Sequence, residues 1–188
     1  MLAVEEPLIS VEEYLEGEKV SEIRHEYVAG QVYAMTGTSK AHNQININLA
    51  FHLRAVTRGQ SCKVFVSDIK VRVPAQDAFY YPDLILTCEP DHQDDYVISA
   101  PCLIAEVLSP STKRIDSRHK WLGYQQLSSL RYYLLIVQDR PFVECYARQG
   151  DTWCYQALSR MEDALPIDCP PITLQLNLAD LYEEVTLP

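Results

Sequence analysis

Residues 80–120 read "YYPDLILTCEPDHQDDYVISAPCLIAEVLSPSTKRIDSRHK", and they place a carboxylate where an apolar residue is expected. Glu106 interrupts the segment "CLIAEVLS" (102–109), which is otherwise typical of a buried strand. Burying an unpaired charge costs several kcal/mol, so a residue of this kind normally has a partner. The segment therefore predicts that Glu106 has a partner, which is either a group elsewhere in the fold or a bound ion.

A second carboxylate, Asp83, follows Pro82 and opens the apolar run "LILTC". Because proline is tolerated at the first residue of a strand, Asp83 is expected near a strand end that faces a cleft. If the two strands are neighbours, Asp83 and Glu106 converge, and adjacent carboxylates repel unless they hold a proton or a divalent cation. Two simpler interpretations stay open: a turn residue for Asp83, and a buried ion pair with an arginine for Glu106.

The remaining pattern predicts a mixed fold. Ser10 followed by Glu13 indicates a capping box and a short first helix that ends at Gly17. Further elements follow from hydrophobic periodicity: a hairpin about Ala29-Gly30, helices over 39–58 and 113–129, strands in 62–73, 80–88, 102–109 and 132–138, a hairpin about 149–151, and a strand and short helix in 172–185. We therefore expect one domain over residues 1–188, of α/β (α+β) class, with a mixed central sheet flanked by helices and a β-hairpin extension.

Composition is that of a globular protein, with 47% apolar and 22% charged residues in 188. No apolar run approaches the roughly 18 residues of a membrane span, and the acidic N-terminus lacks the pattern of a secretory signal. A cytoplasmic protein without a membrane partner is therefore expected. The six cysteines form no CxxC motif and lie mostly in apolar runs, which predicts reduced core thiols.

The formal net charge of −10 counts against a protein that coats nucleic acid through bulk charge. The charge is unevenly distributed, however. Between Val73 and Thr112 there is no lysine or arginine, but there are seven carboxylates: Asp77, Asp83, Glu89, Asp91, Asp94, Asp95 and Glu106. The next eight residues, "KRIDSRHK", contain Lys113, Arg114, Arg118 and Lys120. An acidic patch beside a basic one is what a metal-dependent site acting on phosphates requires.

The order of Pro82-Asp83, an apolar strand, Glu106 in the next strand and a nearby lysine resembles the PD-(D/E)xK nuclease fold. The runs "HEYVAGQVYAMTGTSKAHNQI" (25–45) and "EVLSPSTKRIDSRHKWLGY" (106–124) are similar to the Uma-two restriction-endonuclease-like family in particular. The resemblance extends from about Tyr14 to about Tyr146, and residues 106–124 are its most specific part.

The resemblance implies an endonuclease that hydrolyses DNA with Mg²⁺, for which Mn²⁺ is a possible substitute. Asp83 and Glu106 would be metal ligands, and Glu26 would contribute to the catalytic set. Leu108 stands where the general motif has its lysine, two residues after Glu106. The resemblance implies that the following helix supplies this lysine, as Lys120, although Lys120 and Asp116 are also spaced for an ordinary helix salt bridge.

Lys113, Arg114 and Arg118 are expected to contact phosphates, which fixes register without reading sequence. The expected partners are DNA and a second copy of the chain in a homodimer. His42 also matches a position typical of the family, although its role and that of Asp116 stay open. From the residues alone, Glu26 is equally an exposed charge at a strand start, and His42 is equally a helix-surface or core-edge histidine. The alternative function is a non-catalytic nucleic-acid-binding or regulatory protein that retains the nuclease fold.

Overall fold

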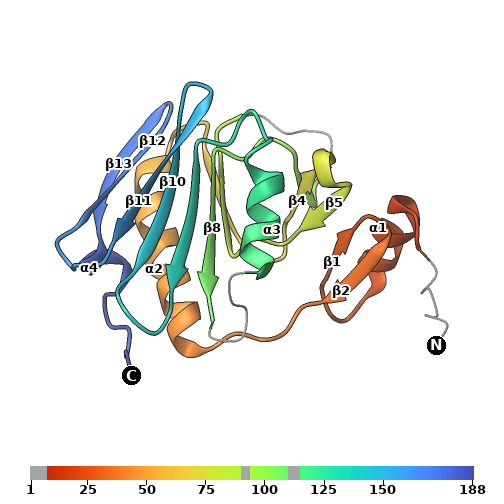
Figure 1. Cartoon of the computed structure of the whole chain (residues 1–188), viewed down its shortest axis with the longest axis horizontal. Coiled ribbons are helices and arrows are strands. Elements are labelled where there is room, and N and C mark those ends of the chain that lie inside the picture. Colours follow the sequence, from red (N-terminus) through yellow and green to blue (C-terminus); the bar gives the residue numbers. More distant parts are fainter. Residues whose placement is uncertain (1–7, 90–93, 110–114) are drawn as a thin grey trace.

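The computed structural model describes residues 8–89, 94–109 and 115–188, without the side chains of residues 115–117. Lys113, Arg114 and the Asp116 side chain therefore lie outside the described residues. The helices are α1 (Val11–Val20), α2 (Lys40–Thr57), the 3-10 turn η1 (Pro74–Gln76), α3 (Ile115–Tyr124) and α4 (Leu178–Leu181) (Figure 1). The strands are β1 (His25–Val28), β2 (Gln31–Ala34), β3 (Lys63–Val66), β4 (Lys70–Val73), β5 (Ala78–Tyr80), β6 (Leu84–Thr87), β7 (Val97–Ile98), β8 (Leu103–Leu108), β9 (Tyr132–Val137), β10 (Val143–Gln149), β11 (Thr152–Leu158), β12 (Ala164–Cys169) and β13 (Ile172–Asn177).

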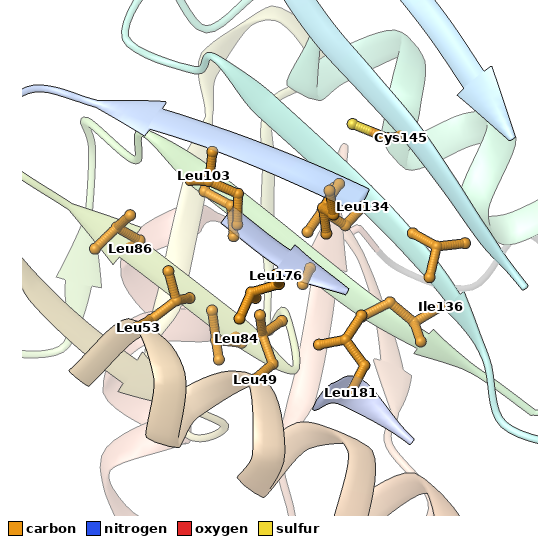
Figure 2. Packing of buried hydrophobic residues seen from close by; sticks show 14 of the residues in the cluster. Leu49, Leu53, Leu84, Leu86, Leu103, Leu134, Ile136, Cys145, Leu176 and Leu181 are labelled. Atoms are coloured by element: carbon orange, nitrogen blue, oxygen red, sulfur yellow. The ribbon is translucent and has the colours of Figure 1, made fainter. Parts of the chain in front are cut away.

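A mixed six-stranded sheet, in the order β11-β10-β9-β8-β6-β3, forms the centre of the molecule. Strand β8 runs parallel to β9 and antiparallel to β6. One face packs against α2, α4 and the β12-β13 hairpin through a cluster that includes Leu49, Leu86, Leu134 and Leu176 (Figure 2). The expected mixed sheet flanked by helices is confirmed, together with the hairpins β1-β2 and β10-β11.

The opposite face of this sheet packs against α3 and a second, five-stranded sheet in the order β2-β1-β5-β4-β7. Along β8, Ala105 and Val107 join the α2-side core, while Ile104 and Leu108 join the α3-side core. Because both faces are covered, β8 is a nearly continuous apolar run instead of an alternating one. Glu106 shares the face of Ile104 and therefore points toward α3.

Several elements differ from the sequence prediction. Residues 62–73 form two strands in different sheets, because Ser67 and Asp68 adopt left-handed conformations with φ of 52° and 49°. Helix α1 continues past Gly17 to Val20, and β12 was not predicted. Helix α3 ends at Tyr124 instead of Ser129. The Arg148 guanidinium on β10 donates to the carbonyl oxygens of residues 125, 127 and 130 at 2.7–2.9 Å. These carbonyl groups are therefore bound by a side chain instead of by the next turn of a helix.

The prediction of reduced core thiols is wrong for four of the six cysteines. Disulfides join Cys62 to Cys88 and Cys102 to Cys169, across sequence separations of 26 and 67 residues. Each disulfide joins two segments that are far apart in the sequence, so no motif of closely spaced cysteines indicates the pairing. Cys145 is a free buried thiol, as expected, and Cys154 is free and exposed. None of the helices in the described part of the chain is long and apolar enough to cross a membrane.

Thiol counting tests this arrangement. Burial raises the pKa of the Cys145 thiol to about 11, and only the thiolate reacts, so the native protein at pH 8 should expose one reactive thiol, Cys154. Denaturation without reductant should give two reactive thiols, and reduction followed by denaturation should give six. The measurement is titration with a disulfide reagent, with mass spectrometry of the alkylated chain. Six reactive thiols without reductant would restore the reduced-thiol interpretation.

Candidate functional site

The pairing of β6 with β8 brings the two acidic residues of the motif together. Leu84 lies opposite Ala105, so the same antiparallel register places Asp83 opposite Glu106. Asp83 precedes the first residue of β6, directly after Pro82, where the strand enters the sheet. The expected placement of the two carboxylates on adjacent strands is therefore confirmed.

The Asp83 carboxylate is held at one of its two oxygens. Its Oδ2 accepts hydrogen bonds from the Val107 amide at 2.7 Å and from His42 Nε2 at 3.1 Å. His42 lies in the first turn of α2, which begins after the N-cap residue Ser39, and its side chain is 8% exposed. Among the described residues nothing donates to Oδ1 of Asp83, so this oxygen can accept a cation. His42 is therefore buried at the edge of the core, as one of the two simple interpretations expected, and is not a helix-surface residue.

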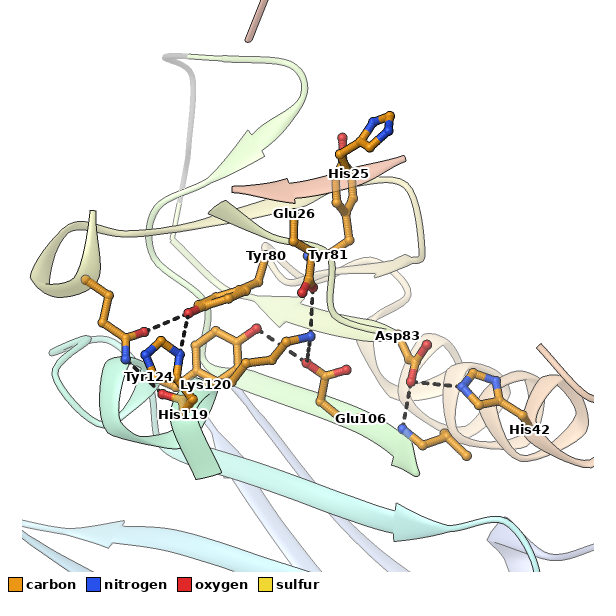
Figure 3. A network of polar contacts seen from close by, with 12 residues as sticks. His25, Glu26, His42, Tyr80, Tyr81, Asp83, Glu106, His119, Lys120 and Tyr124 are labelled. Atoms are coloured by element: carbon orange, nitrogen blue, oxygen red, sulfur yellow. Dashed lines mark hydrogen bonds and ion pairs between the residues drawn. The ribbon is translucent and has the colours of Figure 1, made fainter. Parts of the chain in front are cut away.

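In the described part of the chain, Lys120 is a cation that lies against Glu106. Lys120 Nζ lies 3.6 Å from Glu106 Oε1, and the Tyr124 hydroxyl donates to the same oxygen at 3.4 Å (Figure 3). Burial, and secondarily the negative charge of Glu106, hold the pKa of Tyr124 well above its usual range. Tyr124 therefore remains a neutral donor. Lys120 and Tyr124 both come from α3, the helix that follows β8 in the chain.

Lys120 also makes a closer contact with Glu26. Its Nζ lies 2.7 Å from Glu26 Oε1, and the same oxygen accepts a hydrogen bond from the Tyr81 amide at 3.1 Å. The ammonium lies 5.3 Å from the centre of the Tyr80 ring, within the range of a cation–π contact. The side chains of Glu26 and Lys120 are 12% and 9% exposed. An exposed charge at Glu26 and a lysine engaged solely with Asp116 are both wrong.

The position of α3 depends on close packing at Gly123. A Cβ atom at this position would collide with the side-chain amide of Gln76 in η1. Gln76 in turn donates to the His119 carbonyl at 2.8 Å and accepts from the Tyr80 hydroxyl at 3.0 Å. This contact fixes the backbone beside Lys120 and the ring that its ammonium faces. No sequence pattern indicated it, although a glycine inside a predicted helix is a signal of close packing.

The donor set of the site suits a hard divalent cation. In the described ranges no three His, Cys, Asp or Glu side chains cluster as a metal site. Mg²⁺ needs only one or two carboxylates, with waters and phosphate oxygens completing its shell. Asp83, with one free oxygen, and Glu106, on the facing strand, fit this requirement. Arg118, the described member of the predicted phosphate contacts, is exposed two residues before Lys120.

The ion pairs of Lys120 predict a stability change. Lys120→Ala leaves two nearly buried carboxylates without their cation, so it should lower the free energy of unfolding by about 3 kcal/mol in EDTA. Mn²⁺ should restore part of the loss, because a bound cation stabilises the folded state. Lys19→Ala, which removes an exposed pair with Glu16, should leave the free energy of unfolding close to that of the wild type, because solvent screens such a pair. Urea unfolding followed by circular dichroism measures the free energy of unfolding of Lys120→Ala in EDTA, of Lys120→Ala with Mn²⁺ and of Lys19→Ala. An equal loss of stability in the two variants would contradict the buried-pair account.

The chain is similar to known proteins over most of its length. The profile of the Uma2 family, described as "Putative restriction endonuclease", matches residues 11–179. An uncharacterized protein of Synechocystis is 36% identical over 161 residues, which cover 83% of this chain and 85% of the relative. A second protein of that organism is 30% identical over 154 residues, with 80% and 87% coverage.

The fold is also found in a solved structure. The crystal structure of a "putative nuclease belonging to DUF820" from Anabaena variabilis superposes with a TM-score of 0.76 at 17% identity, over 95% of this chain and 99% of that one. This likeness shows a shared fold that extends over nearly the whole of both chains. The profile match, which extends over most of the chain, shows that the chain belongs to the Uma2 family, described as "Putative restriction endonuclease".

Proposed function

We propose that the protein is a Mg²⁺-dependent endonuclease that hydrolyses phosphodiester bonds in DNA. The observation that carries this proposal is the meeting of four side chains from separate elements. Lys120 of α3 lies between Glu26 of β1 and Glu106 of β8, and Asp83 lies opposite Glu106. Two carboxylates on adjacent strands and a nearby lysine, here supplied by a helix, are the residue types that the nuclease motif uses.

Asp83 and Glu106 would hold Mg²⁺, with Mn²⁺ as a possible substitute, and Glu26 would serve the site through Lys120. When bound, the ion supplies Lewis-acid stabilisation of a phosphate oxygen and lowers the pKa of a coordinated water. His42 and the Val107 amide fix Asp83 Oδ2, which leaves Oδ1 oriented for the cation. Hydrogen bonds of this kind raise the affinity of a metal site, because the ligand is already in place.

Lys120 supplies positive charge where the phosphate becomes more negative in the transition state. A preorganised charge in a partly dry site stabilises such a state more than it would in water. Glu26 positions the ammonium at 2.7 Å, and its own oxygen is fixed by the Tyr81 amide. The lysine therefore reaches the site from a helix, although Leu108 occupies the usual lysine position on the strand.

The family description and the local charge support DNA as the proposed substrate. The net charge of −10 does not attract DNA, so binding would depend on Arg118, with Lys113 and Arg114 expected to add phosphate contacts. We also propose that the protein forms a homodimer. A non-catalytic nucleic-acid-binding or regulatory protein is the second candidate, and the negative net charge and Leu108 are the observations that favour it.

Metal binding separates these two candidates. Asp83→Asn and Glu106→Gln should each lower Mn²⁺ affinity by about 100-fold or more while the circular dichroism spectrum stays native, since each removes a charged ligand. Isothermal titration calorimetry measures the affinity. Asp68→Asn, which removes an exposed carboxylate paired with Arg24, is the matched control and should bind as wild type does. A wild-type protein that binds no Mn²⁺ would favour the non-catalytic candidate.

Turnover tests the role of Lys120. Lys120→Ala should lower single-turnover cleavage about 10²–10³-fold at saturating Mn²⁺, by analogy with loss of one oxyanion donor. Metal affinity should hold or rise, because a positive charge beside Glu106 is gone. The substrates are single-stranded, nicked, branched and duplex DNAs, assayed at a temperature where the variant is folded. Asp116→Ala serves as the control; full activity in Lys120→Ala would remove Lys120 from the mechanism.

A further inference from the structure

Strand β11 forms one edge of the six-stranded sheet and pairs with β10 on its inner side. Of its seven residues, five are exposed: Thr152, Cys154, Tyr155, Gln156 and Ala157. Natural edge strands are normally protected by charged side chains, proline, a bulge or very short length. The sequence of β11, "TWCYQAL", contains no charged residue and no proline, and no described strand is longer.

We propose that β11 is a dimer interface, which pairs antiparallel with β11 of a second copy and joins the two central sheets into one. The two-fold axis passes through residue 155, the centre of the strand. Tyr155 then lies opposite its own copy, residue 154 opposite residue 156, and residue 153 opposite residue 157. Such an interface is isologous, so one surface supplies both sides of the contact.

The chemistry of the strand favours a second copy over other occupants. Self-pairing places every residue opposite an uncharged one, so it meets no like-charge repulsion, and it sets aromatic and small side chains against one another. A nucleic acid would find no cation on the strand. The other exposed edge of comparable composition is β2, "QVYA", but its four residues offer a shorter ladder.

The interface leaves the candidate site accessible. Two strands, β10 and β9, separate β11 from β8, which carries Glu106. In Figure 1, β11 lies on the far side of the sheet from β1 and β2, where Glu26 is located. A dimer of this kind would carry two complete sites in one particle. The inference does not rest on the nuclease proposal, because the pairing depends on the edge of the sheet alone.

The first test is the oligomeric state of the full chain by sedimentation velocity. The wild type should sediment as a dimer at micromolar concentration. Tyr155→Lys puts two ammonium groups directly opposite each other, and it should raise the dimer dissociation constant by about tenfold or more. Tyr155 is 56% exposed, so the monomer should keep its fold, as checked by circular dichroism. Tyr33→Lys on β2, where the wild-type side chain is 51% exposed, is the matched control and should remain dimeric.

The second test fixes the register. Gln156→Cys places a thiol opposite the partner's Cys154, so mild oxidation with diamide should give a covalent dimer on a non-reducing gel. Thr152→Cys places the new thiol opposite Leu158, far from either cysteine, and should stay monomeric on the gel. A monomeric wild type, dissociation by Tyr33→Lys instead of Tyr155→Lys, or equal crosslinking by the two cysteine variants would overturn the proposal.

Discussion

The ion pairs of Lys120 are the interaction on which the rest of the site depends. The ammonium bridges Glu26 at 2.7 Å and Glu106 at 3.6 Å, and all three side chains are nearly buried. Charges removed from water are tolerated only when they are paired and hydrogen-bonded. One lysine thus allows a carboxylate inside β8, links α3 to the sheet, and holds the N-terminal hairpin against both (Figure 3).

The two-sided core gives this charged cluster its rigidity. Strands β6 and β8 are covered on one face by α2 and on the other by the second sheet, so Asp83 and Glu106 occupy fixed positions at the end of a packed ladder. Helix α3 is held by the glycine contact at Gly123 and by Arg148, which binds the carbonyl groups after its last turn. The packing of α3 therefore fixes the backbone that carries Lys120, and with it the position that the flexible side chain can reach.

Local patterns in the sequence predicted the strands and the residues that face one another on them. They did not predict the side-chain contacts between elements that are far apart in the sequence. The facing position of Asp83 and Glu106 follows from two apolar runs of strand length. Lys120 was indicated by family resemblance, because no spacing rule connects a strand residue to a helix residue fourteen positions later. The contacts Glu26–Lys120 and His42–Asp83 span 94 and 41 residues, so no periodicity records them. The disulfides, which span 26 and 67 residues, were missed for the same reason. The left-handed turn after β3 is local, and it was missed because Ser67 and Asp68 are not the glycines that usually mark such a turn.

The difference between the two lysine contacts explains how a helix lysine can serve a site whose strand lacks one. An ammonium equally close to both carboxylates would neutralise Glu106 and compete with any cation that approaches it. Here the shorter contact is with Glu26, whose oxygen is also fixed by the Tyr81 amide. Lys120 can therefore stay on Glu26 when Glu106 and Asp83 take up a cation. In the proposed nuclease, Glu26 would thus hold the Lys120 ammonium beside the metal ligands, and the Glu106 carboxylate would be able to bind the metal ion.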